Sequence, residues 1–166
     1  MTFDRWRPRQ ETTKQEDRLL GRLRRTRKLF AFLRDQRLAL FDDAFQAELE
    51  SMYRDTGAGL EPIPPALLAM IVLLQSYHGM SDAEAIELTV VDLRWQMVLD
   101  RLGATEPACA QGTLVSFRAR LIRSDMDRWL LERTVELARQ TKAFDWKKLP
   151  KDLRVAIDSS PLEGAG

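Results

Sequence analysis

The chain has 166 residues, of which 45% are hydrophobic and 31% are charged, and its formal net charge is +1. This composition supports a folded core and excludes a disordered chain. One cysteine, Cys109, and one histidine, His78, exclude an internal disulfide and argue against a Cys/His metal site or a histidine-based triad.

The longest apolar run, Ala66 to Leu74, is shorter than the roughly 18 residues that a membrane-spanning helix requires. The chain also does not open with a basic segment followed by an apolar stretch and a cleavage site. We therefore expect a cytoplasmic protein that does not enter a membrane.

The small net charge conceals an uneven distribution. Residues 1–37 hold 12 Lys or Arg against 5 Asp or Glu, whereas residues 38–166 hold 14 against 20. The first 37 residues are thus predicted to be a basic arm on a mildly acidic body. Residues 1–10 lack a helical period, so we expect them to be frayed or to order only on binding.

An amphipathic helix is predicted from about Glu11, with Leu19, Leu23, Phe30 and Leu33 on its apolar side. A second helical stretch follows within residues 37–54. Its apolar stripe consists of Phe41, Phe45, Leu49 and Met52. The sequence "RDTGAGLEPIPP" then predicts a loop.

The next helix starts at Pro64 and Pro65 and ends at Gly79, and it is apolar on nearly every face. Such a helix is expected at the centre of the fold. Ser81 and Glu84 match a capping box and predict a new helix after a short turn, which gives the outline of a helix-turn-helix unit.

Further helices are predicted over 90–103, 113–122 and 125–141, with Leu93, Met97 and Val98 of the first facing inward. Only "LRVAID", which ends at Asp158, has the character of a short buried strand. The predicted fold is mainly α, a multi-helix bundle with a helix-turn-helix-like unit and one terminal strand. We divide it into a basic arm and helix (1–37), a helical domain (38–149) and a unit that starts with the strand (150–166).

The strongest candidate for nucleic-acid binding is a cluster of five cations within seven residues, with no acid among them. Arginines spaced along a helix suit contact with phosphates, although a charge run is usually a solvated face. The predicted contacts are Arg22, Arg24, Arg25, Arg27 and Lys28.

The segment "QGTLVSFRARL" is a second candidate, because Leu114, Phe117 and Leu121 would pack inward and leave one polar, basic side. An ordinary surface helix beside a core has the same pattern. The candidate DNA contacts on this side are Arg118, Arg120 and Arg123.

Asp158, followed by "SSP", is the one candidate for metal chemistry. A carboxylate at the end of a buried strand can hold a metal ion, but two-Mg²⁺ sites need several such carboxylates. Read alone, the stretch favours an ordinary turn.

Four stretches in this order resemble the amino-terminal part of bacterial insertion-sequence DDE transposases with the InsH-type N-terminal domain. They are "LFDDAFQAELESMYRDTGAG", "PIPPALLAMIVLLQSYHGMSDAEAIELTVVDLRWQMVL", "QGTLVSFRARL" and "RVAIDSSPLEGAG". The resemblance runs from about residue 28 to the last residue.

This resemblance implies that the helical region binds double-stranded DNA at the terminal inverted repeats of a transposon and helps to form a homodimer, in the bacterial cytoplasm at the nucleoid. It also implies that a ribonuclease H-like domain begins at the strand and that Asp158 is the first of three acids that hold Mg²⁺. A second Asp and a Glu would lie beyond residue 166. We therefore expect the chain to be truncated, to bind no Mg²⁺ by itself and to be inactive alone.

Three alternatives stay open at this point. The chain could associate with full-length transposase through Phe41, Phe45 and Leu49 and inhibit it. It could be a pseudogene product without a selected function. Alternatively, the rest of the catalytic domain could be encoded separately or reached by frameshifting, which would make Asp158 a ligand of an intact enzyme.

Overall fold

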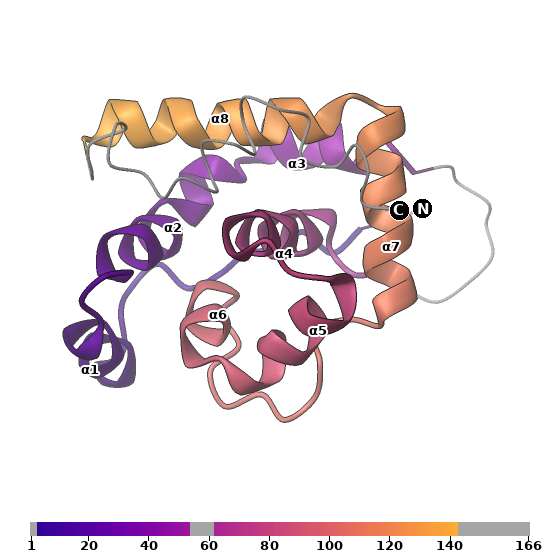
Figure 1. Ribbon diagram of the computed structural model, residues 1–166. Coiled ribbons are helices and arrows are strands. Elements are labelled where there is room, and N and C mark those ends of the chain that lie inside the picture. Colours follow the sequence, from indigo (N-terminus) through magenta and orange to yellow (C-terminus); the bar gives the residue numbers. More distant parts are fainter. Residues whose placement is uncertain (1–2, 54–61, 143–166) are drawn as a thin grey trace.

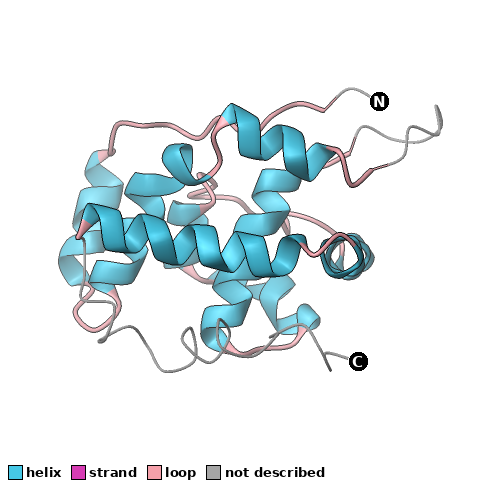
Figure 2. Ribbon diagram, turned by 90° about the horizontal axis from the view of Figure 1, so that it is seen from above, coloured by secondary structure: helices cyan, strands magenta, loops and turns pink. Residues whose placement is uncertain are grey.

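The computed structural model describes residues 3–53 and 62–142, and these ranges contain α-helices joined by loops, with no strand (Figures 1 and 2). The helices are α1 (Lys14–Arg22), α2 (Arg27–Leu40), α3 (Asp43–Glu50), α4 (Pro65–His78), α5 (Asp82–Val91), α6 (Leu93–Val98), α7 (Gln111–Arg123) and α8 (Met126–Thr141). The mainly α prediction is confirmed. The predicted strand and Asp158 lie outside the described residues.

Helix α4 is the centre of the fold, as its uniformly apolar sequence predicts. Every residue from Pro65 to Gln75 is buried. Helix α8 lies along α2 on one side of α4, α5 and α6 lie on the other, and α7 joins the two sides by packing on both α8 and α5 (Figure 1). None of the described helices is both long and apolar enough to cross a bilayer.

The turn between α4 and α5 follows the predicted chemistry. Gly79 adopts a left-handed conformation with φ of 64°, which ends α4 and favours glycine. After Met80, the Ser81 hydroxyl accepts a hydrogen bond from the Glu84 N–H, and the Glu84 carboxylate accepts one from the Ser81 N–H. The predicted capping box is therefore confirmed, and the two helices are joined by three residues, 79–81.

Two of the predicted helices are each divided in the structure. The helix expected from Glu11 is α1 and α2, separated at residues 23–26, where Leu23 is extended. The helix expected over 90–103 is the end of α5 followed by α6, because the Asp92 carboxylate accepts the Arg94 and Trp95 N–H groups and starts a new helix. Met97 and Val98 are buried as predicted, but Leu93 is 51% exposed, so its inward placement was wrong.

The N-terminal segment, residues 3–13, packs on the helices, so the expectation of a start that is frayed or orders only on binding is wrong for residues 3–10. Trp6 is buried, and its N–H and carbonyl exchange hydrogen bonds of 3.1 Å with the Gln46 side chain on α3. The Arg5 guanidinium donates to the Glu50 carboxylate at 2.9 Å. An aromatic residue and a reciprocal amide pair thus fix a stretch that has no helical period of its own.

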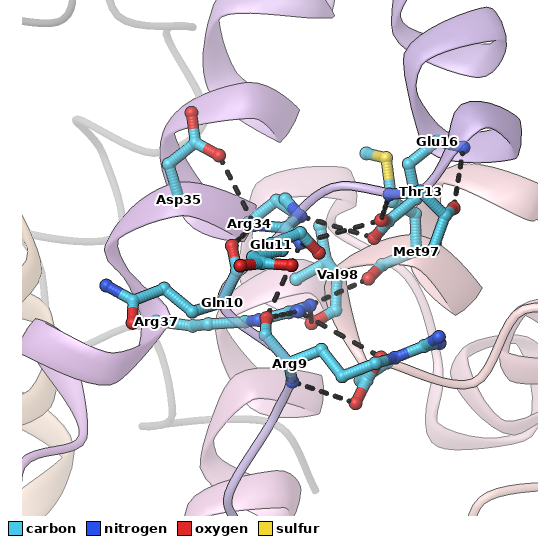
Figure 3. Close-up of polar contacts among 11 residues, drawn as sticks. Arg9, Gln10, Glu11, Thr13, Glu16, Arg34, Asp35, Arg37, Met97 and Val98 are labelled. Atoms are coloured by element: carbon cyan, nitrogen blue, oxygen red, sulfur yellow. Dashed lines mark hydrogen bonds and ion pairs between the residues drawn. The ribbon is translucent and has the colours of Figure 1, made fainter.

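Two arginines on α2 hold the rest of this segment in place (Figure 3). Arg34 is 2% exposed and donates to the carbonyls of Gln10 at 2.8 Å and Glu11 at 2.7 Å. It also pairs with the buried Glu16 carboxylate at 3.2 Å. A charged group that leaves water needs such partners, because burial without them costs several kcal/mol.

Arg37, one turn further along α2, is 1% exposed and joins three parts of the chain. Its guanidinium donates to the carbonyl of Arg9 at 2.5 Å and to those of Met97 and Val98 on α6 at 2.9 and 3.0 Å. Burial, together with the neighbouring Arg34 charge, lowers the pKa of Arg37 to about 10, so the group stays charged at neutral pH.

Replacing Arg37 with Met is expected to destabilise the protein by about 3 kcal/mol, because three backbone carbonyls, two of them in buried hydrogen bonds, lose a charged donor. Chemical denaturation with circular dichroism measures this change. Arg7→Met is the matched control, since Arg7 is 61% exposed and its loss should matter by about 0.5 kcal/mol or less. Equal effects of the two variants would contradict the structural role of Arg37.

The buried pair of Arg34 and Glu16 predicts a specific loss of stability in acid. Burial opposes ionisation of Glu16, but hydrogen bonds from the Thr13 N–H and Arg34 outweigh it, so the pKa of Glu16 lies below its usual value. The stabilisation is therefore fully present above the ordinary glutamate pKa and disappears as pH falls through the lowered one. Glu16→Gln should flatten this part of the stability curve, and an unchanged curve would refute the assignment.

Candidate nucleic-acid interface

Part of the positive charge of the first 37 residues is neutralised within the fold. Arg7 pairs with Asp43 at 2.6 Å, and Arg9 pairs with Asp100 at 3.0 Å. Arg5 pairs with Glu50, and Arg34 and Arg37 lie in the interior, as described above. Asp43, Glu50 and Asp100 are thus ion-pair partners of the N-terminal arginines within the same chain.

The five cations predicted as the main DNA contacts behave differently. All five are exposed, and within residues 3–53 and 62–142 none has an ion-pair or hydrogen-bond partner for its side chain. They lie at the end of α1, in the link and in the first turn of α2, and we call this set the basic junction: Arg22, Arg24, Arg25, Arg27 and Lys28.

The start of α2 adds to the positive potential of the basic junction. The first turn of this helix contains no acid, and the Thr26 side chain does not cap it. The first N–H groups of an α-helix carry partial positive charge, which attracts anions and repels cations. Placing Arg27 and Lys28 there is unfavourable in isolation and becomes favourable when a phosphate lies against the turn.

Arg94, on α6, is a further cation beside the basic junction. Its Nη1 donates to the Thr26 hydroxyl at 3.5 Å, and its guanidinium lies 4.9 Å from the centre of the Phe30 ring. Arg94 is also paired with Asp92 at 2.7 Å, and that hydrogen bond raises the pKa of Arg94. Sequence reasoning missed this residue, because only the fold brings α6 next to the start of α2.

The three arginines predicted on α7 do not form one exposed face. Arg118 is buried, pairs with Asp82 at 2.5 Å and hydrogen-bonds the Gln75 side chain. The half-buried Arg120 stacks on the Tyr53 ring at 4.3 Å, which leaves Arg123 as the exposed member of the three. Figure 1 places α7 and α1 at opposite ends of the molecule, so these arginines and the basic junction are separate surfaces.

Other predicted functional residues are internal or outside the described ranges. Phe41, Phe45 and Leu49 are almost completely buried, so the stripe suggested for association with full-length transposase is part of this chain's own core. Burial lowers the pKa of His78 and raises that of the Cys109 thiol to about 11, which suits structural roles for both.

Asp158 is not among the described residues, and those residues contain no group of three His, Cys, Asp or Glu that could hold a metal ion.

Arg118 and Arg123 are expected to respond differently to replacement by leucine. Arg118→Leu removes the buried guanidinium that pairs with Asp82 and donates to the Gln75 side-chain oxygen where α4, α5 and α7 meet, and should cost about 3 kcal/mol in the free energy of unfolding. Arg123→Leu removes an exposed side chain and should change it by about 0.5 kcal/mol or less. Urea denaturation of both variants tests the assignment, which fails if Arg118→Leu is as stable as the parent.

Comparison with known proteins gives one result. The family model described as "Transposase domain (DUF772)" matches residues 17–120, which is well over half of the chain. The match includes α2 to α6 completely, together with the basic junction and most of α7. Searches of curated proteins and of solved structures give no match.

Proposed function

The chain belongs to this family of transposase domains, and from that premise we propose that it is the DNA-binding part of a transposase. The basic junction contacts the phosphates of double-stranded DNA, and the DNA is the terminal inverted repeat of the mobile element. Binding orients the transposon end, and cutting and joining belong to the catalytic part of the transposase.

The observation that carries this proposal is the separation of the cations into two groups. Arg5, Arg7 and Arg9 are already neutralised by Glu50, Asp43 and Asp100. The five cations of the basic junction are exposed, close together and without an acidic partner in the described part of the chain. Mutual repulsion makes such a cluster costly unless an anion neutralises it, and a phosphate backbone presents anions at regular spacing.

Arg123, with the half-buried Arg120, is a smaller candidate contact at the other end of the molecule. Arg118 is left out of the proposed DNA surface, because its guanidinium is committed to Asp82 and Gln75. A DNA duplex bound at the basic junction therefore does not require α7 to act as a recognition helix.

We extend the proposal to Asp158 as the first carboxylate of an Mg²⁺ site, with the other two acids supplied by the rest of a catalytic domain. Its support is the position of Asp158 at the end of "RVAID", before "SSP". Sequencing the DNA that follows the codon for Gly166 tests this part. A reading frame with further strands, a second Asp and a Glu-bearing helix would support it, and the lack of one in any frame would refute it.

The double variant Arg24→Gln/Arg25→Gln should weaken DNA binding and reduce its salt dependence. Each lost phosphate contact lowers the slope of log K against log salt by about 0.9, so the slope should fall by about 1.8. Fluorescence anisotropy with a labelled duplex, repeated at several salt concentrations, measures both quantities.

The matched control is Arg7→Gln/Arg128→Gln, which removes the same charge from exposed positions outside the basic junction. This control should bind with nearly the parental slope. An identical loss of slope in both variants would show a nonspecific effect of net charge, and an unchanged slope in the junction variant would refute the proposed contact.

A further inference from the structure

Two apolar side chains stand out on the surface where α5 meets α6. Val91 is 63% exposed and Leu93 is 51% exposed, and no other large hydrophobic residue in the described ranges is as exposed as these two. Further along α6, by contrast, Trp95, Met97 and Val98 are buried. We call the stretch from Val91 to Leu93 the apolar corner.

The apolar corner is held rigidly by the residue between its two side chains. The Asp92 N–H donates to the Leu88 carbonyl at 3.1 Å. Its carboxylate accepts the Arg94 N–H at 2.8 Å and the Arg94 guanidinium at 2.7 Å. These bonds hold the end of α5 and the start of α6 together. Binding a partner therefore requires little further loss of backbone conformational entropy at the corner.

The apolar corner adjoins the basic junction through Arg94. That residue follows Leu93, donates to Thr26 inside the junction and stacks on Phe30 of α2. Helix α6 also packs on both α1 and α2. The fold therefore packs the helix that begins with Leu93 against the two helices that flank the basic junction, whose five cations have no acidic partner in the described residues.

This combination fits a groove of duplex DNA. The phosphates along the groove match the charge of the basic junction, and the sugars and base edges between them offer apolar surface, including the thymine methyl group in the major groove. The match to a transposase domain favours DNA over an acidic protein surface as the anionic partner.

We propose that Val91 and Leu93 make an apolar contact in a groove of the same DNA duplex whose phosphates the basic junction binds. This inference rests on the proposed function and adds a contact of different physical character. Protein contacts with phosphates release counterions from the DNA, and this release becomes less favourable as the salt concentration rises. Burial of apolar side chains does not involve counterions. The two contributions can therefore be measured separately.

The test uses the full chain and a fluorescent duplex of about three helical turns and mixed sequence, titrated at several salt concentrations. Val91→Thr/Leu93→Gln keeps side-chain size and charge but makes both side chains polar. We expect the Kd to rise by about five- to tenfold at every salt concentration, as the loss of roughly half-buried aliphatic contacts implies, with an unchanged slope. Leu93→Met should retain nearly parental affinity.

The matched control is Val115→Thr/Ile122→Gln, which makes the same chemical change at two exposed positions of α7. The inference is supported if the control binds with parental affinity and the corner variant gives a plot of log Kd against log salt that is parallel to the parental plot and shifted to higher Kd. Parental affinity in the corner variant, or a larger loss in the α7 control, overturns it and leaves the phosphate contacts intact. Lack of salt-dependent binding by the unmodified chain overturns the proposed function as well.

Self-association is the remaining outcome, and sedimentation of the DNA-free chain detects it. Loss of a dimer in the corner variant, without a change in DNA affinity, would assign the corner to a second copy of the protein and contradict the inference. Both pairs of substitutions are at exposed positions, so thermal unfolding should show that each variant is folded.

Discussion

The fold depends on two guanidinium groups of α2 that lie beneath the N-terminal segment. Arg34 and Arg37 are one turn apart and almost inaccessible to water. Between them they hydrogen-bond backbone carbonyls of residues 9–11 and of α6, and Glu16 lies against Arg34. Two like charges in one interior are costly, and these acceptors compensate for the cost only while the segment is in place. The N-terminal residues are therefore part of the folded body.

This interior arrangement determines which charges remain for a partner. Once the N-terminal segment is docked, Arg5, Arg7 and Arg9 lie against acids of the body, and the basic junction keeps its charges unpaired in the described structure. Helix α6 packs on α2, and the Arg94 side chain of α6 reaches Thr26, which lies between the cations of the junction. Arg34 and Arg37 thus stabilise the fold, whereas the exposed cations of the basic junction are available to bind a partner.

Local patterns in the sequence predicted much of the fold. The apolar α4, the glycine that ends it, the capping box of α5 and the buried Leu114, Phe117 and Leu121 follow from side-chain spacing alone, and all are confirmed. The role of each arginine could not be predicted this way, because nothing in the local sequence distinguishes the buried Arg37 and Arg118 from the exposed Arg25. Only long-range contacts make the first two internal, with partners on α6 and on α4 and α5. The exposure of Leu93 was missed for a related reason, since Asp92 starts a new helix and shifts the face that Leu93 occupies.

Hydrogen–deuterium exchange of the chain with and without duplex DNA tests the central claim most directly. If the basic junction binds phosphates, the amides of residues 22–28 should exchange more slowly in the complex, because the open first turn of α2 gains acceptors. Residues 3–10 should be unaffected, since their arginines are already paired. Protection confined to α7, or no protection at residues 22–28 under saturating DNA, would contradict the account.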